Sequence, residues 1–414
     1  MEAISAASLF FVVGVILFAA RVAGGLARRL GQPRVLGELL IGVILGPTVL
    51  DLLHAPLLHG ASLEPIIKYL AEIGVVLLMF LVGLEVNLKE LAQVGRVGVL
   101  GGVLGAIIPV VLTVPVMLLF QYEFFPAVFA GVTLAATSVS ISAQVLLELG
   151  ILRTKIGNAL LATALVDDIV AIVLVSLTIA IGTSSSATLD ISGLLGIILQ
   201  MALYLVIGFL IAWFILPPVV NWVSSQPYLA QNYGIPILAL MIAMLFAWSA
   251  EALGGVATIT GSFIAGVGLS RVKHHAKQEI ENVVSSLAYV IFVPIFFIDV
   301  GLSTNLAIFP LSALPFALVV LVVAVVSKIG GCGWGALLGG FNRDESLRLG
   351  VCMVARGEVG LIIASLGLTM DVFHRESPIF SVLFLVILVT TLMTPFLVRM
   401  IFPSQGAVPQ VAKG

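Results

Sequence analysis

The chain has 414 residues, of which 61% are apolar and only 10% are charged, and its mean hydropathy is +1.24. This small number of polar groups cannot cover the surface of a water-soluble globule of this length. We therefore expect most of the chain to lie in lipid. The net charge of −2 comes from 19 basic and 21 acidic residues, which excludes the basic footprint of a nucleic-acid-binding protein. The two cysteines, Cys332 and Cys352, offer neither a disulfide framework nor a metal-ligand spacing.

Thirteen apolar segments follow one another along the chain. They lie near residues 6–27, 35–50, 66–86, 97–120, 126–148, 156–182, 190–216, 233–251, 255–270, 284–302, 310–338, 348–369 and 378–402. Most are long enough to cross a bilayer, whereas 35–50 and 255–270 are short enough to be half-buried instead. The connections are short, so the sequence predicts one all-α polytopic membrane domain over residues 1–402 and a short cytoplasmic tail at 403–414.

Basic residues are unevenly distributed between the loops on the two sides of the predicted membrane. Fourteen lie on one side: Arg28, Arg29, Arg34, Lys89, Arg96, Arg153, Lys155, Arg271, Lys273, Lys277, Arg343, Arg348, Arg399 and Lys413. Only Lys68 and Arg375 lie on the other. Because cytoplasmic loops carry the excess of Lys and Arg, this bias predicts an external N-terminus and a cytoplasmic C-terminus.

An odd number of segments indicates two inverted six-helix repeats joined by one linker helix, as in many secondary transporters. Hydroxyl side chains, Thr137 and Ser138 among them, interrupt the fifth segment, AVFAGVTLAATSVSISAQVLLELG. Arg356, Gly357 and Glu358 interrupt the twelfth, LGVCMVARGEVGLIIASLGL, which is the fifth of its own half. We therefore predict two crossed discontinuous helices that meet at an ion-binding site. The alternative is that the small residues only allow close helix packing.

Two adjacent aspartates, Asp167 and Asp168, lie in the otherwise apolar run LLATALVDDIVAIVLVSLTIAIG. A carboxylate at membrane depth costs roughly 2.5 to 3.5 kcal/mol, and adjacent carboxylates repel each other. We therefore interpret the pair as a site that takes up charge. Carboxylates, hydroxyls, carbonyls and water are also the oxygen ligands that sodium prefers, and a cation and a proton compete for the same carboxylate oxygens.

Lys328 lies in the apolar run LVVAVVSKIGGCGWGALLGG with no acidic residue near it in the sequence. A lone buried ammonium group sheds its proton, so we expect a partner on another helix, either Asp167 or Asp168. A switching role is favoured over a static bridge, because desolvation cancels most of the Coulomb gain of a purely structural buried pair.

Several segments together carry a resemblance to a known family. They are GQPRVLGELLIGVILGPTVL, LAEIGVVLLMFLVGLEVNL, ATSVSISAQVLLELG, TALVDDIVAIV, VVSKIGG and VARGEVGLIIASLGL. In this order they resemble the bacterial monovalent cation:proton antiporter-2 family of sodium/proton and potassium/proton exchangers. The resemblance implies a thirteen-helix homodimer with an elevator-like cycle. Its core helices are at about 97–182 and 310–402, its dimerisation helices at about 6–86 and 233–302, and its linker helix at 190–216.

The resemblance also implies roles for the three ionisable residues in the middle of the membrane. Asp168 matches the carboxylate that alternately holds a cation and protons, and Asp167 matches its neighbour, so sodium is expected at this pair. Lys328 matches the lysine that pairs with Asp167 when no cation is bound.

At the two helix breaks, Thr137 and Ser138 match residues that help to coordinate the ion. Arg356 and Glu358 match the charged break of the second crossed helix. The chain departs from the family pattern at Ala355, where close relatives are expected to have proline, which makes the shape of that break less certain.

The sequence therefore predicts electrogenic exchange of sodium for protons, with potassium as the alternative cation and a cation channel less favoured because a channel needs no lysine partner. An intramembrane aspartyl protease is disfavoured, since adjacent aspartates point about 100° apart on one helix. Asp299 is interpreted as a residue of an aqueous funnel rather than a second ion site.

The expected partners are membrane lipid, monovalent cations, protons and a second copy of the chain, and the expected location is a bacterial inner membrane. Enzymatic activity, a cofactor and a nucleic-acid partner are not expected. No Walker-type motif is present in the sequence, so no nucleotide-binding domain is predicted.

Overall fold

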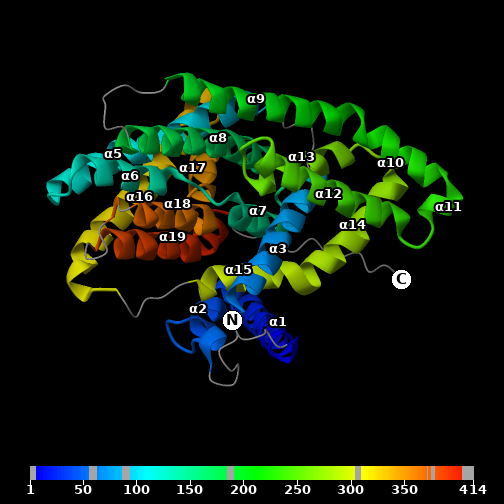
Figure 1. Ribbon diagram of the computed structural model, residues 1–414, viewed down its shortest axis with the longest axis horizontal. Coiled ribbons are helices and arrows are strands. Elements are labelled where there is room, and N and C mark those ends of the chain that lie inside the picture. The colour runs from blue at the N-terminus through cyan, green and yellow to red at the C-terminus, as the bar shows by residue number, and fades with distance from the viewer. Residues whose placement is uncertain are drawn as a thin grey trace.

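The computed structural model describes residues 6–55, 63–85, 94–183, 191–303, 309–370, 372–373 and 378–402, and its regular elements are helices (Figure 1). The helices are α1 (Ala6–Arg29), α2 (Arg34–Leu45), α3 (Glu64–Glu85), α5 (Gly95–Leu119), α6 (Phe124–Ala135), α7 (Val139–Glu148), α8 (Lys155–Thr183), α9 (Ile191–Phe214), α10 (Leu216–Ser225), α11 (Pro227–Ala230), α12 (Gly234–Ala252), α13 (Thr258–Leu269), α14 (His274–Leu287), α15 (Val293–Leu302), α16 (Leu314–Gly339), α17 (Arg343–Cys352), α18 (Gly357–Thr369) and α19 (Ile379–Ile401). A π-helical turn, Ala288–Phe292, joins α14 to α15. The predicted tail 403–414 and the loop residues Lys89 and Arg375 lie outside the described residues.

Ten stretches of helix within the described residues are long and apolar enough to cross a membrane. The other three predicted segments coincide with α2, with α13 and with the interrupted pair α17 and α18. Helices α2 and α13 have 12 residues each. At 1.5 Å per residue they extend about 18 Å, less than the roughly 30 Å of a hydrocarbon core. The protein is therefore an integral membrane protein with about ten clear spans, and the count of thirteen crossings stays a prediction.

The helices pack in two groups (Figure 1). The first, here called the core group, contains α5–α8 and α16–α19, in which α5 lies between α8 and α16. The second, the flanking group, contains α1–α3 and α12–α15, in which α13 packs against α3 and α12, and α2 packs against α1 and α15. The long helix α9 contacts α8 of the core group and α13 of the flanking group.

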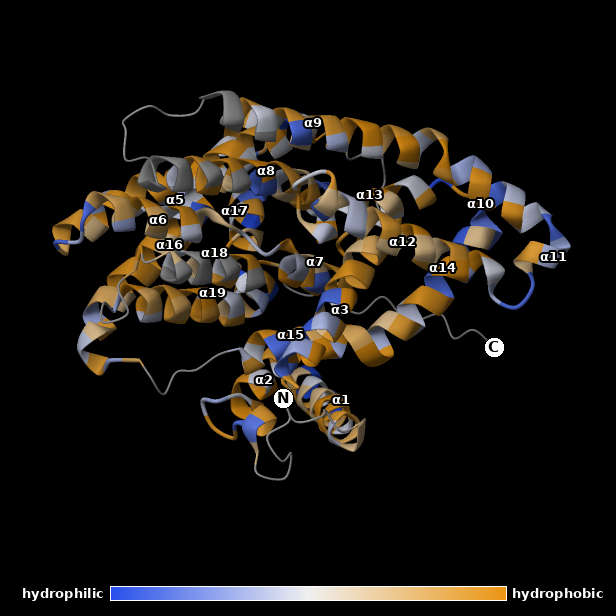
Figure 2. Cartoon of the chain, viewed as in Figure 1, coloured by the Kyte–Doolittle hydropathy of each residue, from blue (hydrophilic) through white to orange (hydrophobic). Residues whose placement is uncertain are grey.

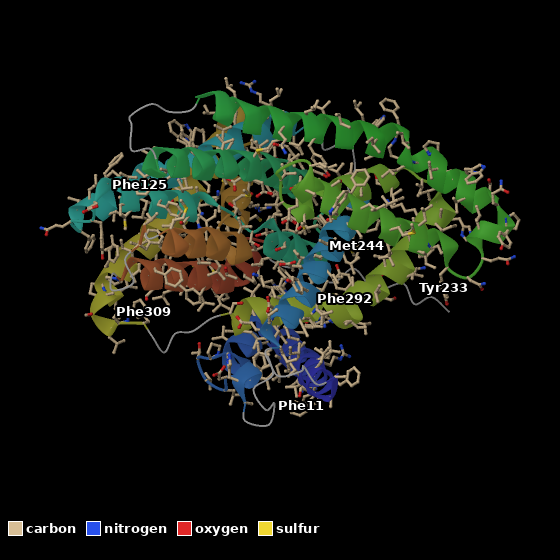
Figure 3. The ribbon with its side chains drawn as sticks, in the orientation of Figure 1. Phe11, Phe125, Tyr233, Met244, Phe292 and Phe309 are labelled. Carbon is tan, nitrogen blue, oxygen red and sulfur yellow. The ribbon has the colours of Figure 1, made fainter. Side chains whose placement is uncertain are left out.

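The outer surface is apolar, as a lipid environment requires. Apolar residues cover most of the helices, whereas polar residues gather at helix ends and at a few interior positions (Figure 2). Large side chains such as Phe11 lie at the periphery (Figure 3) and are exposed. Near the ends of α10 to α12, the aromatic residues Trp222, Tyr228 and Tyr233 are exposed, as is typical of residues at a membrane–water interface.

Candidate functional site

Two interrupted helices meet at their breaks inside the core group. Helix α6 ends at Ala135 and α7 begins at Val139, whereas α17 ends at Cys352 and α18 begins at Gly357. The Ser138 backbone N–H donates to the Ala355 carbonyl at 2.9 Å. One turn away, the Ser142 hydroxyl donates to the carbonyl of Cys352. The two breaks predicted from the sequence are thus hydrogen-bonded to each other.

The local sequence explains the close approach of the two breaks. Gly357 has a φ of +48°, and a Cβ there would lie 2.5 Å from the Cβ of Ser138, so a residue with a side chain would be strained and crowded. The hydroxyls of Ser138 and Ser140 are 2.9 Å apart and form a hydrogen bond. Ala355 contributes a carbonyl that a proline would also supply, so this departure from the family pattern keeps the contact with Ser138.

Two buried cations bind the carbonyl end of α6. Lys328 Nζ donates to the carbonyls of Ala135 at 2.7 Å and Gly105 at 2.9 Å. Arg356 donates to the carbonyls of Ala136 at 3.3 Å and Ala324 at 2.7 Å. The C-terminus of a helix carries a partial negative charge, so these contacts place positive charge where unsatisfied carbonyls need it.

Lys328 on α16 also forms an ion pair with Asp167 on α8. Lys328 Nζ lies 2.7 Å from Asp167 Oδ1, and both side chains are 0% exposed. The pair reaches past α5 at Gly105, where an added Cβ would collide with Cys332 Sγ of α16. Of the two partners that the sequence allows for Lys328, the structure selects Asp167.

Three buried oxygens near the breaks have no hydrogen-bond partner among the described residues. They are Asp167 Oδ2, Thr137 Oγ1 and Thr163 Oγ1. Leaving a buried acceptor unsatisfied costs about 1–3 kcal/mol, more when it is charged. Such oxygens are the ligands that a hard monovalent cation requires, so these residues fit a cation site.

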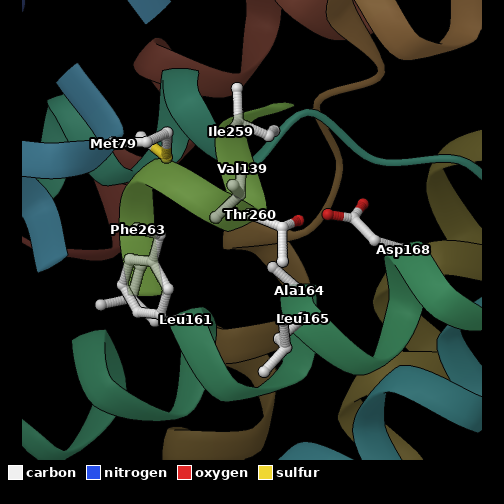
Figure 4. A pocket seen from close by; sticks show the side chains of 9 residues that line it. All are labelled: Met79, Val139, Leu161, Ala164, Leu165, Asp168, Ile259, Thr260 and Phe263. Atoms are coloured by element: carbon white, nitrogen blue, oxygen red, sulfur yellow. The ribbon is translucent and has the colours of Figure 1, made fainter. Parts of the chain in front are cut away.

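Asp168 faces a different part of the molecule from Asp167. It is half-buried and lines a cavity of about 20 Å³ between α8 and two helices of the flanking group, α3 and α13 (Figure 4). Met79, Leu161 and Phe263 contribute apolar walls to this cavity. The two adjacent aspartates therefore occupy two environments, one inside the core group and one at its boundary.

The predicted site residues separate into those that the structure brings together and those that it does not. Ser138, Asp167, Lys328 and Arg356 lie around the two breaks. The side chain of Glu358 lies outside the described residues.

Asp299, on α15, interacts electrostatically with Glu64, Lys68 and Glu72 of α3. Both of these helices belong to the flanking group. Asp299 is therefore part of a separate charged cluster, away from the ion pair in the core group.

Sequence reasoning missed three kinds of partner. The backbone carbonyls that bind Lys328 and Arg356 have no signal in residue types. Thr163 precedes Asp167 by one helical turn, a spacing that places both on one face of α8 and that a search at i−4 would have found. Thr260, which lines the cavity beside Asp168, comes from a helix whose position relative to α8 is a tertiary fact.

Two discontinuous helices with ionisable side chains at their breaks, in an all-helical membrane protein, define the architecture of a secondary transporter. Comparison with known sequences gives the family. Residues 6–402 match the family described as sodium/hydrogen exchanger, transmembrane, and the chain belongs to that family.

Individual relatives agree with this membership. The chain is 36% identical to the Na(+)/H(+)-K(+) antiporter GerN of Bacillus cereus, with 98% of this chain and 99% of the relative covered. It is 34% identical to a Na(+)/H(+) antiporter of Enterococcus hirae, with 94% and 96% covered. The solved structure of the sodium proton antiporter MjNhaP1 of Methanocaldococcus jannaschii superimposes with a TM-score of 0.67, at 18% identity and with 96% of this chain and 99% of that chain covered, and supports the fold.

Proposed function

We propose that this protein is a secondary antiporter that exchanges sodium for protons across a membrane and performs no covalent chemistry. The observation that carries the proposal is the cluster of Asp167, Asp168 and Lys328 beside two helix breaks. The names of the relatives in Bacillus cereus and Enterococcus hirae, both antiporters of sodium and protons, support the same activity.

Coupling follows from competition for the same oxygens. Asp168 binds either the cation or a proton, and Asp167 is the second carboxylate that sodium reaches. Thr137 and Ser138 contribute hydroxyl or carbonyl oxygen ligands from the first break, and Arg356 holds the second break against the first through its hydrogen bond to the Ala136 carbonyl. A site that crosses only when it is loaded gives exchange rather than a leak.

Lys328 makes the exchange cycle electrogenic, because it releases a second proton. When sodium binds Asp167, the lysine loses its carboxylate partner and sheds a proton, because a lone buried ammonium group is unfavourable. Two protons then exchange for one sodium ion, and the membrane potential contributes about 2.3 kcal/mol per 100 mV for the net charge moved. A reversal potential that indicates equal charge in both directions would exclude this electrogenic cycle.

The finer architecture is part of the same proposal. The chain belongs to the antiporter-2 branch, with thirteen crossings in two inverted six-helix repeats and a linker helix. The core group moves in an elevator-like manner against the flanking group, through which two copies form a homodimer. The native location is a bacterial inner membrane, with the N-terminus outside and the tail 403–414 in the cytoplasm.

Potassium is the second candidate cation. The observation that favours it is the name of the Bacillus cereus relative, which includes both sodium and potassium. The transported ions are substrates, and the proposal needs no resident cofactor.

The test uses purified protein in liposomes with an imposed pH gradient and an internal pH dye. Sodium, potassium or lithium is added in turn, and addition of the transported cation is expected to collapse the gradient. Asp168→Asn should abolish the response, because an amide cannot exchange a proton for a cation. The matched control is Asp299→Asn, a half-buried aspartate in the flanking group, which should retain exchange.

Three results would contradict the proposal. The gradient would persist with every cation, or it would collapse equally in Asp168→Asn, or the cation flux would be insensitive to the pH gradient. The last result would favour a channel.

A further inference from the structure

The cavity beside Asp168 lies between the core group and the flanking group, and each group contributes one polar side chain to its lining. Of the residues that line it, Asp168 and Thr260 are the polar ones, and the others are apolar. Figure 4 shows the carboxylate of Asp168 and the hydroxyl of Thr260 pointing toward one another. Asp168 belongs to α8 of the core group, and Thr260 belongs to α13 of the flanking group.

Thr260 has the burial and the position of a residue with a specific partner. It is 6% exposed, and it lies in the first turn of α13, which begins at Thr258 after an N-cap residue, Ala257, that supplies no side-chain hydrogen bond. The first turn of a helix carries unsatisfied N–H groups and a partial positive charge, which favour a nearby carboxylate in its ionised form. A hydroxyl that donates to the carboxylate favours the same form.

The same geometry disfavours a cation on the α13 side of Asp168. A helix N-terminus repels positive charge, and the cavity of about 20 Å³ has room for the centre of roughly one water-sized sphere, with apolar residues as its remaining walls. The flanking group therefore offers donors to an empty carboxylate rather than a shell of ligands to a loaded one.

We infer that Thr260 is a positioning residue that holds the ionised, cation-free Asp168 against the flanking group. This inference rests on the proposed function. While Asp168 is empty and charged, its contact with Thr260 keeps the core group in place. Protonation removes the acceptor charge, and cation binding draws the carboxylate oxygens away from α13, so either event releases the contact. Thr260 thereby prevents the empty carrier from crossing and keeps the two fluxes coupled.

The experiment replaces the hydroxyl by a methyl group in Thr260→Val and measures two fluxes in liposomes. The first is sodium-driven proton exchange, and the second is proton flux without any transported cation, with a large organic cation as the only salt. A hydrogen bond to a charged group contributes enough to slow the empty crossing roughly tenfold, so the proton flux without sodium should rise by about that factor. Sodium-driven exchange should remain measurable.

Two further variants make the result specific. Thr260→Ser keeps the hydroxyl and should leak no more than the parent protein. Thr258→Val makes the same change two residues earlier, at a position that does not line the cavity, and should also behave as the parent. Melting temperatures of all three variants show whether each is folded.

A proton flux without sodium that is unchanged in Thr260→Val would overturn the inference. If the KM for sodium also rises in that variant, the hydroxyl is a cation ligand instead. Failure of the proposed function is a different result, since the parent protein itself would then show no sodium-driven exchange.

Discussion

The ion pair of Lys328 and Asp167 lies wholly within the core group, whereas a second polar network joins the core group to the flanking group. This boundary network consists of Arg34, Glu38, Gln144, Glu148 and Tyr289. It lines a cavity of about 310 Å³, far larger than the space beside Asp168. The two networks contain similar residue types in very different surroundings.

Two of the four contacts of the boundary network cross between the helix groups, and the other two lie within α2 and within α7. The Arg34 backbone N–H, on α2, donates to Glu148 Oε2 on α7 at 2.7 Å, and Arg34 Nε lies 2.5 Å from Glu38 Oε1. Gln144 donates to Glu148 at 3.1 Å and accepts from the Tyr289 hydroxyl at 3.3 Å. Tyr289 lies in the π-helical turn, a feature often found at functional sites.

The ion pair and the boundary network differ in how much each contact stabilises the fold and in which helices the contacts join. A fully buried pair cannot lose one partner without leaving a charge that water cannot reach, so removing either partner is strongly destabilising. In the boundary network Glu38 is buried, but Arg34 and Glu148 are half-buried beside a cavity with room for water, so a contact at Glu148 contributes less to stability than the fully buried pair does. Because the boundary network spans both groups, it should act instead on the relative motion that the proposed elevator-like cycle requires.

The largest effect on stability is expected when the buried ion pair of Lys328 and Asp167 loses one partner. Lys328→Met leaves Asp167 buried without its cation and should lower the free energy of unfolding by about 3–5 kcal/mol. Equilibrium unfolding in mixed detergent micelles measures this change.

The double variant Lys328→Met with Asp167→Asn is the control for the Lys328→Met measurement. It removes both charges and should recover most of the lost stability. A single variant that costs less than about 1 kcal/mol would show that the pair is solvated and would erase the contrast with the boundary network.

A smaller effect on stability is expected at Glu148. Glu148→Gln removes a charge from the boundary network and should change the free energy of unfolding by less than ~1 kcal/mol. The rate of exchange should change by a factor of roughly two to five, because the altered contact joins the two groups that move in the proposed cycle. Flux assays in liposomes measure this factor.

The matched control for Glu148 is Glu251→Gln, an exposed carboxylate at the end of α12. It should alter neither stability nor rate. If Glu148→Gln destabilises the protein as strongly as Lys328→Met does, solvation does not distinguish the two networks.

Much of the site could be predicted from residue types and helical periodicity. Adjacent positions on a helix point about 100° apart, and accordingly Asp167 contacts Lys328 while Asp168 faces the cavity. Runs of hydroxyls and glycine that disfavour a continuous helix predict the breaks before Val139 and at Gly357.

The remaining features depend on tertiary placement. The carbonyl of Ala324 binds Arg356, although every residue has a carbonyl and nothing in the sequence distinguishes this one. Thr260 approaches Asp168 only because α13 packs beside α3 and α9 at the boundary. Segment lengths also show only that α2 and α13 are short, and their orientation depends on the helices around them.

An exposed ion pair supplies the baseline for the comparison and the smallest expected effect. Lys155 Nζ, at the first residue of α8, lies 2.8 Å from Glu345 Oε1 at the start of α17, and Glu345 lies outside the apolar spans. The hydrogen bond from Lys155 and that from the Asn342 backbone N–H hold the pKa of Glu345 below its ordinary value of 4.5. A lowered pKa means that folding stabilises the ionised form, so this stability is complete above about pH 4.5 and is lost as the pH falls through the lowered pKa. Melting temperatures of the parent and Glu345→Gln should therefore differ slightly at neutral pH and converge in acid. A difference that persists in acid would indicate a packing effect at the start of α17 instead of an electrostatic one.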